Sequence, residues 1–255
     1  MDAETLYASQ QAAYMGRLRA NFSRALTVTL AWVALLGAVF FAQDRLFDTQ
    51  ALAIAPQRAD GLLGVLTAPL LHGDFGHLSA NAFAILVLGS IAGSLYPRAS
   101  LRAWPVVWLG SGLGTWFISM GGHHIGASGI TVGLMFFLIA QGLRRRDRSA
   151  LTGLLLAMFF FGGMVFSVLP QQQGVSWEYH LSGAVFGLIT GLAFAGLDER
   201  APKRLYSWDL EPEQDTPAME AELDLPAPRD VPVLWHRPPP PEGGKILPFR
   251  RPPPS

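Results

Sequence analysis

Six apolar runs of membrane-spanning length follow one another along most of the chain. Each holds about 16 to 20 residues, close to the roughly 20 that a helix needs to cross the hydrocarbon of a bilayer. Six such runs in succession are difficult to bury in a water-soluble domain. The pattern therefore predicts an all-α membrane protein with a bundle of six transmembrane helices. The runs cover residues 25–42, 77–96, 104–120, 128–143, 151–169 and 179–197.

The composition agrees with a membrane protein. Half of the residues are hydrophobic and only 15% are charged, whereas a soluble domain carries about a quarter charged residues. The formal net charge is zero, so nucleic-acid binding through bulk electrostatics is not expected. The chain has no cysteine, which excludes disulfides, thiolate zinc sites and a cysteine nucleophile. The leader before the first run is long and of mixed charge, so we expect a retained helix rather than a cleaved signal peptide.

Positive charges gather in alternate connections between the runs. By the positive-inside rule this bias predicts that both termini are cytoplasmic and that the loops 43–76, 121–127 and 170–178 face outward. We expect an integral, multi-pass protein of a prokaryotic cell (inner) membrane. The residues that carry the bias are Arg17, Arg19, Arg24, Arg98, Arg102, Arg144, Arg145, Arg146, Arg148, Arg200, Lys203 and Arg204, against Arg45 and Arg58 on the other side.

Three parts follow from this division. Residues 1–24 form a cytoplasmic N-terminal segment, residues 25–197 the membrane domain, and residues 198–255 a cytoplasmic tail that holds 14 of the 19 prolines. This composition predicts a disordered, partly polyproline-II tail. It favours a solvated segment with no fixed partner, and an unidentified proline-reading partner is the alternative.

Four polar side chains fall at a similar predicted depth in three of the helices. His77 and Asn81 are four residues apart and so share a helix face, Ser128 opens the fourth run, and His180 lies in the sixth. Counted from the predicted cytoplasmic ends, Asn81, Ser128 and His180 lie about 24 to 27 Å up, at about 1.5 Å per residue. Polar groups inside a membrane are costly, which makes this layer a candidate functional site.

The fourth run is too short to span the hydrocarbon, so the loop "GGHHIGA" (121–127) is expected to dip into the membrane. Ser128 would then lie at the floor of a cavity open to the outside, at a helix N-terminus with free N–H groups. Glycines at four-residue spacing let the fourth and sixth helices approach closely. These glycines are Gly129, Gly133, Gly183, Gly187 and Gly191.

These groups are the parts needed for acyl transfer. Ser128 would be the nucleophile and His180 the general base, while the Ser128 N–H, His77 and Asn81 would donate to the oxyanion. The three polar helices lack an acidic residue to orient His180, and Glu178 points elsewhere, so a Ser–His dyad is expected. Taken alone, a serine beside glycine in a membrane helix is most often a packing residue, but the shared depth favours a joint role. His72 is expected to brace the outer loop, and His123 and His124 to cap or line the cavity mouth.

Three motifs resemble those of the rhomboid family of intramembrane serine proteases. "HGDFGHLSAN" (72–81) is similar to the histidine-rich start of that family's second helix, "GASG" (126–129) to its G-x-S-G nucleophile motif, and "HLSGAVFG" (180–187) to its H-x-x-G-x-x-x-G helix. The order of the motifs and the six-helix layout also agree. The resemblance covers roughly residues 25–197.

The resemblance implies a protease that cleaves transmembrane segments of other membrane proteins near small residues close to the outer surface. It implies the same roles for Ser128, His180, His77 and Asn81, and no metal, ATP or other cofactor. "FFFGG" (159–163) would be part of a lateral gate for substrate, with a lipid-facing phenylalanine cluster as an equal alternative.

The chain departs from the family pattern at three places. Val132 stands where many members have an aromatic residue that stacks on the catalytic histidine, and Gly93 replaces an acidic residue. The outer loop lacks the family's Trp-Arg pair. Two rival hypotheses are a catalytically inactive relative that binds or traffics other proteins, and a small transporter or metal-handling protein. Against the second, the chain shows no repeat between its halves and no H-x-x-x-H pair on one helix face.

Overall fold

The computed structural model describes residues 3–170, 174–203 and 206, and these residues form helices and loops without a β-strand. The chain divides into two compact units, Met1–Leu205 and Tyr206–Ser255. Most of the predicted disordered tail lies outside the described residues. The elements are α1 (Ala3–Ala42), η1 (Asp60–Leu62), α2 (Gly64–Thr67), η2 (Ala68–Leu70), α3 (Phe75–Ala84), the π-helical turn η3 (Ile85–Gly89), α4 (Ser90–Leu95), α5 (Pro97–Ile118), α6 (Ser128–Arg145), α7 (Arg148–Phe161), the 3-10 segment η4 (Gly162–Val168) and α8 (Trp177–Ala193).

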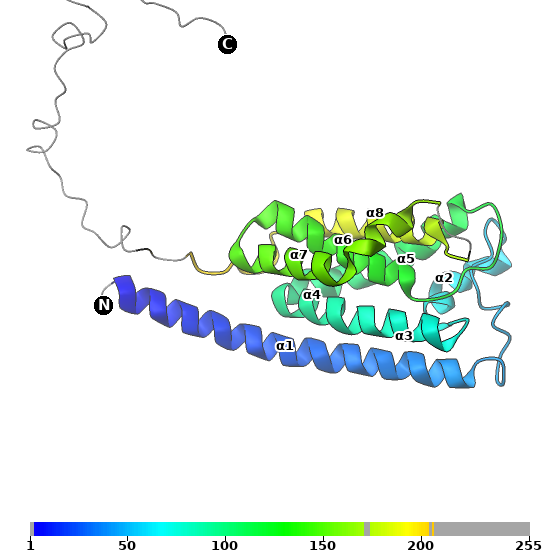
Figure 1. The fold of residues 1–255 in the computed structure, drawn as a ribbon, viewed down its shortest axis with the longest axis horizontal. Helices are drawn as coiled ribbons and strands as arrows, with labels where there is room; N and C mark the ends of the chain where they lie inside the picture. Colours follow the sequence, from blue (N-terminus) through cyan, green and yellow to red (C-terminus); the bar gives the residue numbers. More distant parts are fainter. Residues whose placement is uncertain (1–2, 171–173, 204–205, 207–255) are drawn as a thin grey trace, which may run out of the picture. The chain divides into compact units, whose positions relative to one another are not determined.

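Each predicted apolar run coincides with a helical segment, so the all-helical prediction is confirmed for the described residues (Figure 1). Two helices begin well before the apolar run, whereas the other starts lie within three residues of it. Helix α1 begins at Ala3 rather than at residue 25, because its polar first half is rich in Ala, Gln and Arg, which favour helix, and contains no proline. Helix α5 begins at Pro97, where proline suits the first helical position.

Three helical segments are long and apolar enough on their own to cross a membrane, namely Glu4–Ala42, Phe75–Leu95 and Arg148–Val168. Helix α6 instead buries most of its length against other helices, including the polar side chains of Thr131, Gln141 and Arg145. A helix enclosed by protein does not need the hydropathy of one that faces lipid. The count of six spans and the common side of the two termini stay predictions.

Helices α6 and α8 pack backbone to backbone through their glycines. A Cβ atom placed on Gly183 would lie 2.1 Å from the carbonyl oxygen of Gly129, and one on Gly187 equally close to that of Gly133. Small residues at four-residue spacing allow such an approach. This contact positions the start of α6, where Ser128 lies, beside the first turns of α8, where His180 lies.

Helix α1 lies along α3 and α4 on one side of the bundle (Figure 1). Close packing comes from Gly89 and Gly93, where an added Cβ would stand 2.7 Å from Thr29 and from Ala25 of α1. The Thr29 and Ser90 hydroxyls are 3.1 Å apart and share a hydrogen bond. Gly93, one of the departures from the family pattern, therefore has a packing role here, since a larger residue would push α1 away.

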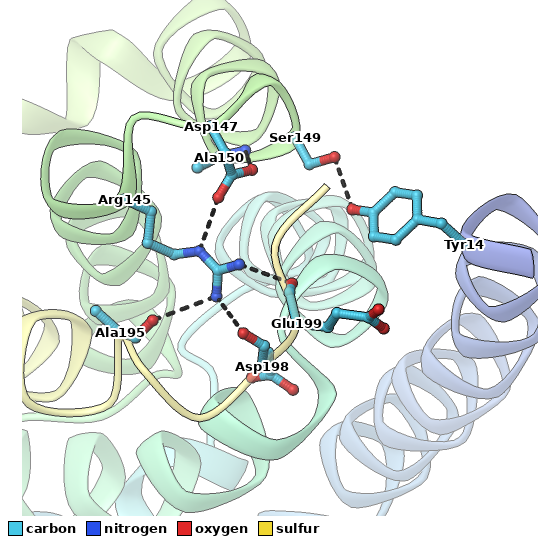
Figure 2. A network of polar contacts seen from close by, with 8 residues as sticks. All are labelled: Tyr14, Arg145, Asp147, Ser149, Ala150, Ala195, Asp198 and Glu199. Carbon is cyan, nitrogen blue, oxygen red and sulfur yellow. Dashed lines mark hydrogen bonds and ion pairs between the residues drawn. The ribbon is translucent and has the colours of Figure 1, made fainter. Parts of the chain in front are cut away.

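A buried arginine joins three segments (Figure 2) at the opposite end of the bundle from the loop 119–127 (Figure 1). The Arg145 guanidinium donates to the Asp147 carboxylate at 3.0 Å and to the backbone carbonyls of Ala195, Asp198 and Glu199 at 3.3, 3.0 and 2.7 Å. Its carbon lies 5.1 Å from the centre of the Tyr96 ring. The start of the predicted tail is thus held against the ends of α6 and α8.

Candidate active site

A cavity of about 1110 Å³ opens beside α3, α6 and α8. His77, Asn81, Ser128 and His180 all line it, together with side chains from α7, η4 and the loop 119–127. The structure therefore brings together the four residues that the sequence placed at one depth.

Ser128 is the first residue of α6, and its position is set by the loop before it. Gly126 has a φ of +110°, a conformation that L side chains rarely adopt. The Gly126 N–H donates to the Ala68 carbonyl at 2.9 Å, and His124 exchanges two backbone hydrogen bonds with Ile54. Within the described residues, neither the Ser128 N–H nor its hydroxyl has a hydrogen-bond partner, so both are free to meet a ligand.

His77 and Asn81 lie on one face of α3, as their spacing predicted. Asp74 caps this helix by accepting from the His77 N–H at 2.8 Å. The His77 ring lies directly over Gly126, because a Cβ there would be 2.5 Å from its Cε1 and Nε2 atoms. The Asn81 amide donates one N–H to the His77 carbonyl at 3.0 Å, which leaves its second N–H available.

His180 is 9% exposed and has a partner that sequence reasoning missed. Its Nδ1 lies 3.2 Å from the backbone carbonyl oxygen of Ser167 in η4. A carbonyl oxygen only accepts, so Nδ1 carries the proton in this contact and Nε2 keeps its lone pair. No sequence signal points to this partner, because every residue has a backbone carbonyl.

Within the described residues, no hydrogen bond joins the Ser128 hydroxyl to His180. Such bonds are often long in ligand-free sites and shorten only when substrate binds. Both side chains line the same cavity. The helices that carry them, α6 and α8, are in backbone contact at Gly129 and Gly183.

The remaining histidines lie towards the cavity mouth. His124 Nε2 and the Ser119 hydroxyl are 3.0 Å apart, and the same hydroxyl donates to Glu178 at 3.2 Å. Burial lowers the pKa of His124, and the Glu178 charge opposes this effect. His123 is exposed and also lines the cavity. Among the residues that the structure describes, no three His, Asp or Glu side chains are grouped to hold a metal ion.

His72 braces the outer loop through its backbone rather than through its ring. Its N–H and carbonyl form a pair of hydrogen bonds with the Gln43 side chain, at 3.2 and 2.5 Å. The imidazole is fully buried, and its ring centre lies 5.1 Å from that of His77.

The phenylalanines at the end of α7 divide between the cavity and the outside. Phe159 is 81% exposed, whereas Phe161 is 8% exposed and packs on Phe83 of α3 with ring centres 5.7 Å apart. Phe160 and Phe161 line the cavity. An aromatic contact between α3 and α7 therefore borders the cavity on this side.

A helical bundle with three segments long and apolar enough to cross a bilayer, and with serine and histidine side chains lining one cavity, indicates a membrane protein. The family model of the Rhomboid domain matches residues 59–196. This match covers more than half of the chain and includes all four candidate residues, and the chain therefore belongs to the rhomboid family.

Similar proteins occur in mycobacteria. An uncharacterized protein of Mycobacterium tuberculosis is 38% identical over 157 residues, which cover 58% of this chain and 65% of the relative. An uncharacterized protein of Mycobacterium leprae is 35% identical over 141 residues, or 52% of this chain and 56% of the relative. The chain thus spans less than two thirds of the length of these curated relatives. Their names state no activity, and they indicate a bacterial origin.

Proposed function

We propose that this chain is an intramembrane serine endopeptidase that cleaves transmembrane segments of other proteins near the outer face of the membrane. The observation that supports this function best is one cavity lined by Ser128, His180, His77 and Asn81, in a chain of the rhomboid family. The rhomboid family consists in general of such proteases.

In the proposed reaction, Ser128 Oγ forms a bond to the scissile carbonyl carbon while His180 Nε2 takes the hydroxyl proton. The C–N bond then breaks and His180 returns that proton to the leaving amine. A water molecule attacks the acyl-enzyme with His180 again as the base, which releases the acid product and restores Ser128. The Ser167 carbonyl holds the Nδ1–H tautomer throughout and so takes the orienting role of the missing carboxylate.

The negative charge on the tetrahedral intermediate needs donors at the floor of the cavity. The unpartnered N–H of Ser128 at the start of α6 is one, and the second amide N–H of Asn81 and the His77 ring are the others. Each donor of this kind contributes on the order of 10²- to 10³-fold to turnover. Because several act together, loss of Asn81 alone should reduce cleavage less than loss of Ser128 or His180.

The substrate would enter between α3 and α7. Phe161 and Phe83 border that side of the cavity with one aromatic contact. An apolar transmembrane segment can displace such a contact at little cost, because both sides are apolar in lipid.

The proposed function is tested by labelling the full chain in membranes with a fluorophosphonate. Wild type should be labelled and Ser128→Ala should not. Ser79→Ala is the matched control, since Ser79 is an exposed serine of α3 that does not line the cavity, and it should label as wild type does. In parallel, Ser128→Ala and His180→Ala should each abolish cleavage of a single-span substrate without unfolding the protein. A folded wild type that neither labels nor cleaves would favour the inactive-relative hypothesis.

A further inference from the structure

Two adjoining cavities lie at the arginine-rich end of the bundle, away from the candidate active site. The first, of about 550 Å³, is polar and lies among α1, the start of α5 and residues 198–199. The second, of about 450 Å³, is an apolar groove among α1, η3, α4 and α5. Both are lined by Asn21, Arg24 and Pro97, so the polar cavity continues directly into the groove.

The first cavity has a surplus of unpaired positive charge. Arg17, Arg24 and Arg98 line it together with Asp198 and Glu199. Arg17 pairs with the Glu199 carboxylate at 2.9 Å. The Asp198 carboxylate accepts from the backbone N–H groups of Arg98 and Ala99 at 3.0 and 2.9 Å, which caps α5.

The carboxylates of Asp198 and Glu199 thus already have hydrogen-bond or ion-pair partners. Within the described residues, the guanidinium groups of Arg24 and Arg98 have no hydrogen-bond or ion-pair partner, and both residues are exposed. Guanidinium groups bind phosphate oxygens well because they present several N–H donors in one plane.

The groove is built for an extended apolar chain. Trp32 and Trp104 meet edge to face, with ring centres 5.9 Å apart, and form one wall. Val28 and Leu101 lie at its edge and are 67% and 75% exposed. The groove, of about 450 Å³, has a mostly apolar lining and is open at its edge, which suits an acyl chain.

We propose that these two cavities form one binding site for an anionic glycerophospholipid. Its phosphate lies at Arg24 and Arg98, and one acyl chain lies in the groove along Trp32 and Trp104. The arginine-rich end is predicted to be cytoplasmic, and that leaflet carries a negative surface charge from its lipids. The bound lipid connects α1 to α4 and α5 and therefore stabilises the folded bundle.

The test uses the purified full chain in a neutral detergent with phosphatidylglycerol or phosphatidylcholine of identical acyl chains. Affinity is read from native mass spectrometry and from the thermal unfolding midpoint. Phosphatidylglycerol should bind and raise the midpoint more than phosphatidylcholine. The double variant Arg24→Gln/Arg98→Gln should weaken phosphatidylglycerol binding about 25-fold, from about fivefold per basic residue. The control Arg144→Gln/Arg148→Gln removes two exposed arginines that line neither cavity and should bind as wild type does.

A second variant tests the groove. Val28→Trp fills it from its exposed edge and should weaken phosphatidylglycerol binding, whereas Val185→Trp on α8, which is 43% exposed and outside the groove, should not. The proposal is overturned if the two lipids bind equally or if the arginine pair matches its control. It is also overturned if inorganic phosphate alone raises the midpoint as much as the lipid does. Loss of substrate cleavage in Val28→Trp with unchanged lipid affinity would instead assign the groove to a transmembrane peptide.

Discussion

Alanine at Gly183 tests whether the contact between α6 and α8 sets the geometry of the candidate dyad. The new Cβ would lie 2.1 Å from the carbonyl oxygen and 2.9 Å from the carbonyl carbon of Gly129. Both are backbone atoms, so no side chain can rotate out of the way. Ordinary contact begins near 3.4 Å, and the helices must therefore separate by about 1.3 Å at this point.

This separation acts one residue from Ser128 and three residues from His180. A misplacement of about 1 Å between reacting groups can reduce turnover about 100-fold. Overpacking of this kind also costs about 1–3 kcal/mol of stability. We therefore expect Gly183→Ala to cut cleavage of a single-span substrate in proteoliposomes about 100-fold while the protein still folds.

Gly37→Ala is the matched control, because a Cβ at this position of α1 meets no atom within 4 Å. It should leave cleavage unchanged and slightly favour the helix. Initial cleavage rates, the rate of fluorophosphonate labelling and the thermal unfolding midpoint are compared for the three proteins. If Gly183→Ala cleaves within about threefold of wild type, the link from glycine contact to dyad geometry is refuted.

Two further predictions concern stability. Arg145→Gln should lower the free energy of unfolding by about 3–5 kcal/mol, because it removes the guanidinium donor from the mostly buried Asp147 carboxylate and from three backbone carbonyls. Arg144→Gln, at an exposed neighbouring position, should change the free energy of unfolding by less than about 0.5 kcal/mol. Denaturation curves of the two variants are compared, and equal losses would contradict a stabilising role of the Arg145 network. Burial, aided by the nearby His77, lowers the pKa of His72 from 6.5 to about 4. As the pH falls, His72 is therefore protonated in the unfolded chain before it is protonated in the folded one. The contribution of neutral His72 to the free energy of unfolding is complete above pH 6.5 and is lost as the pH falls towards 4. His72→Phe should flatten this part of a plot of unfolding midpoint against pH, and an unaltered plot would show that His72 is not its source.

The apolar runs were sufficient to place the helices. Each run is so long that it is expected to form a helix whichever segments pack against it. They were insufficient for the start of α1, where hydropathy falls but helix-forming residues continue to Ala3. The four polar residues that the sequence placed at one depth line one cavity. Their individual roles stay predictions.

Other contacts depend on the chain's path in space and could not be read from local pattern. Arg145 was grouped with its neighbours as a loop charge, yet it is buried at the end of α6. A signal was present, since Leu138, Gln141 and Arg145 recur at helical spacing on a buried face. Capping of α5 by Asp198 joins residues about a hundred positions apart, and no local signal could indicate it.

The carbonyl that holds His180 belongs to η4, which continues α7 directly. Any outward swing of α7 carries that carbonyl with it and frees the imidazole to turn. If substrates pass between α3 and α7, the helix that moves to admit them also carries the carbonyl that orients His180. His180 would then be poorly oriented while α7 is displaced. It would return to its catalytic orientation only after α7 has moved back behind the bound segment.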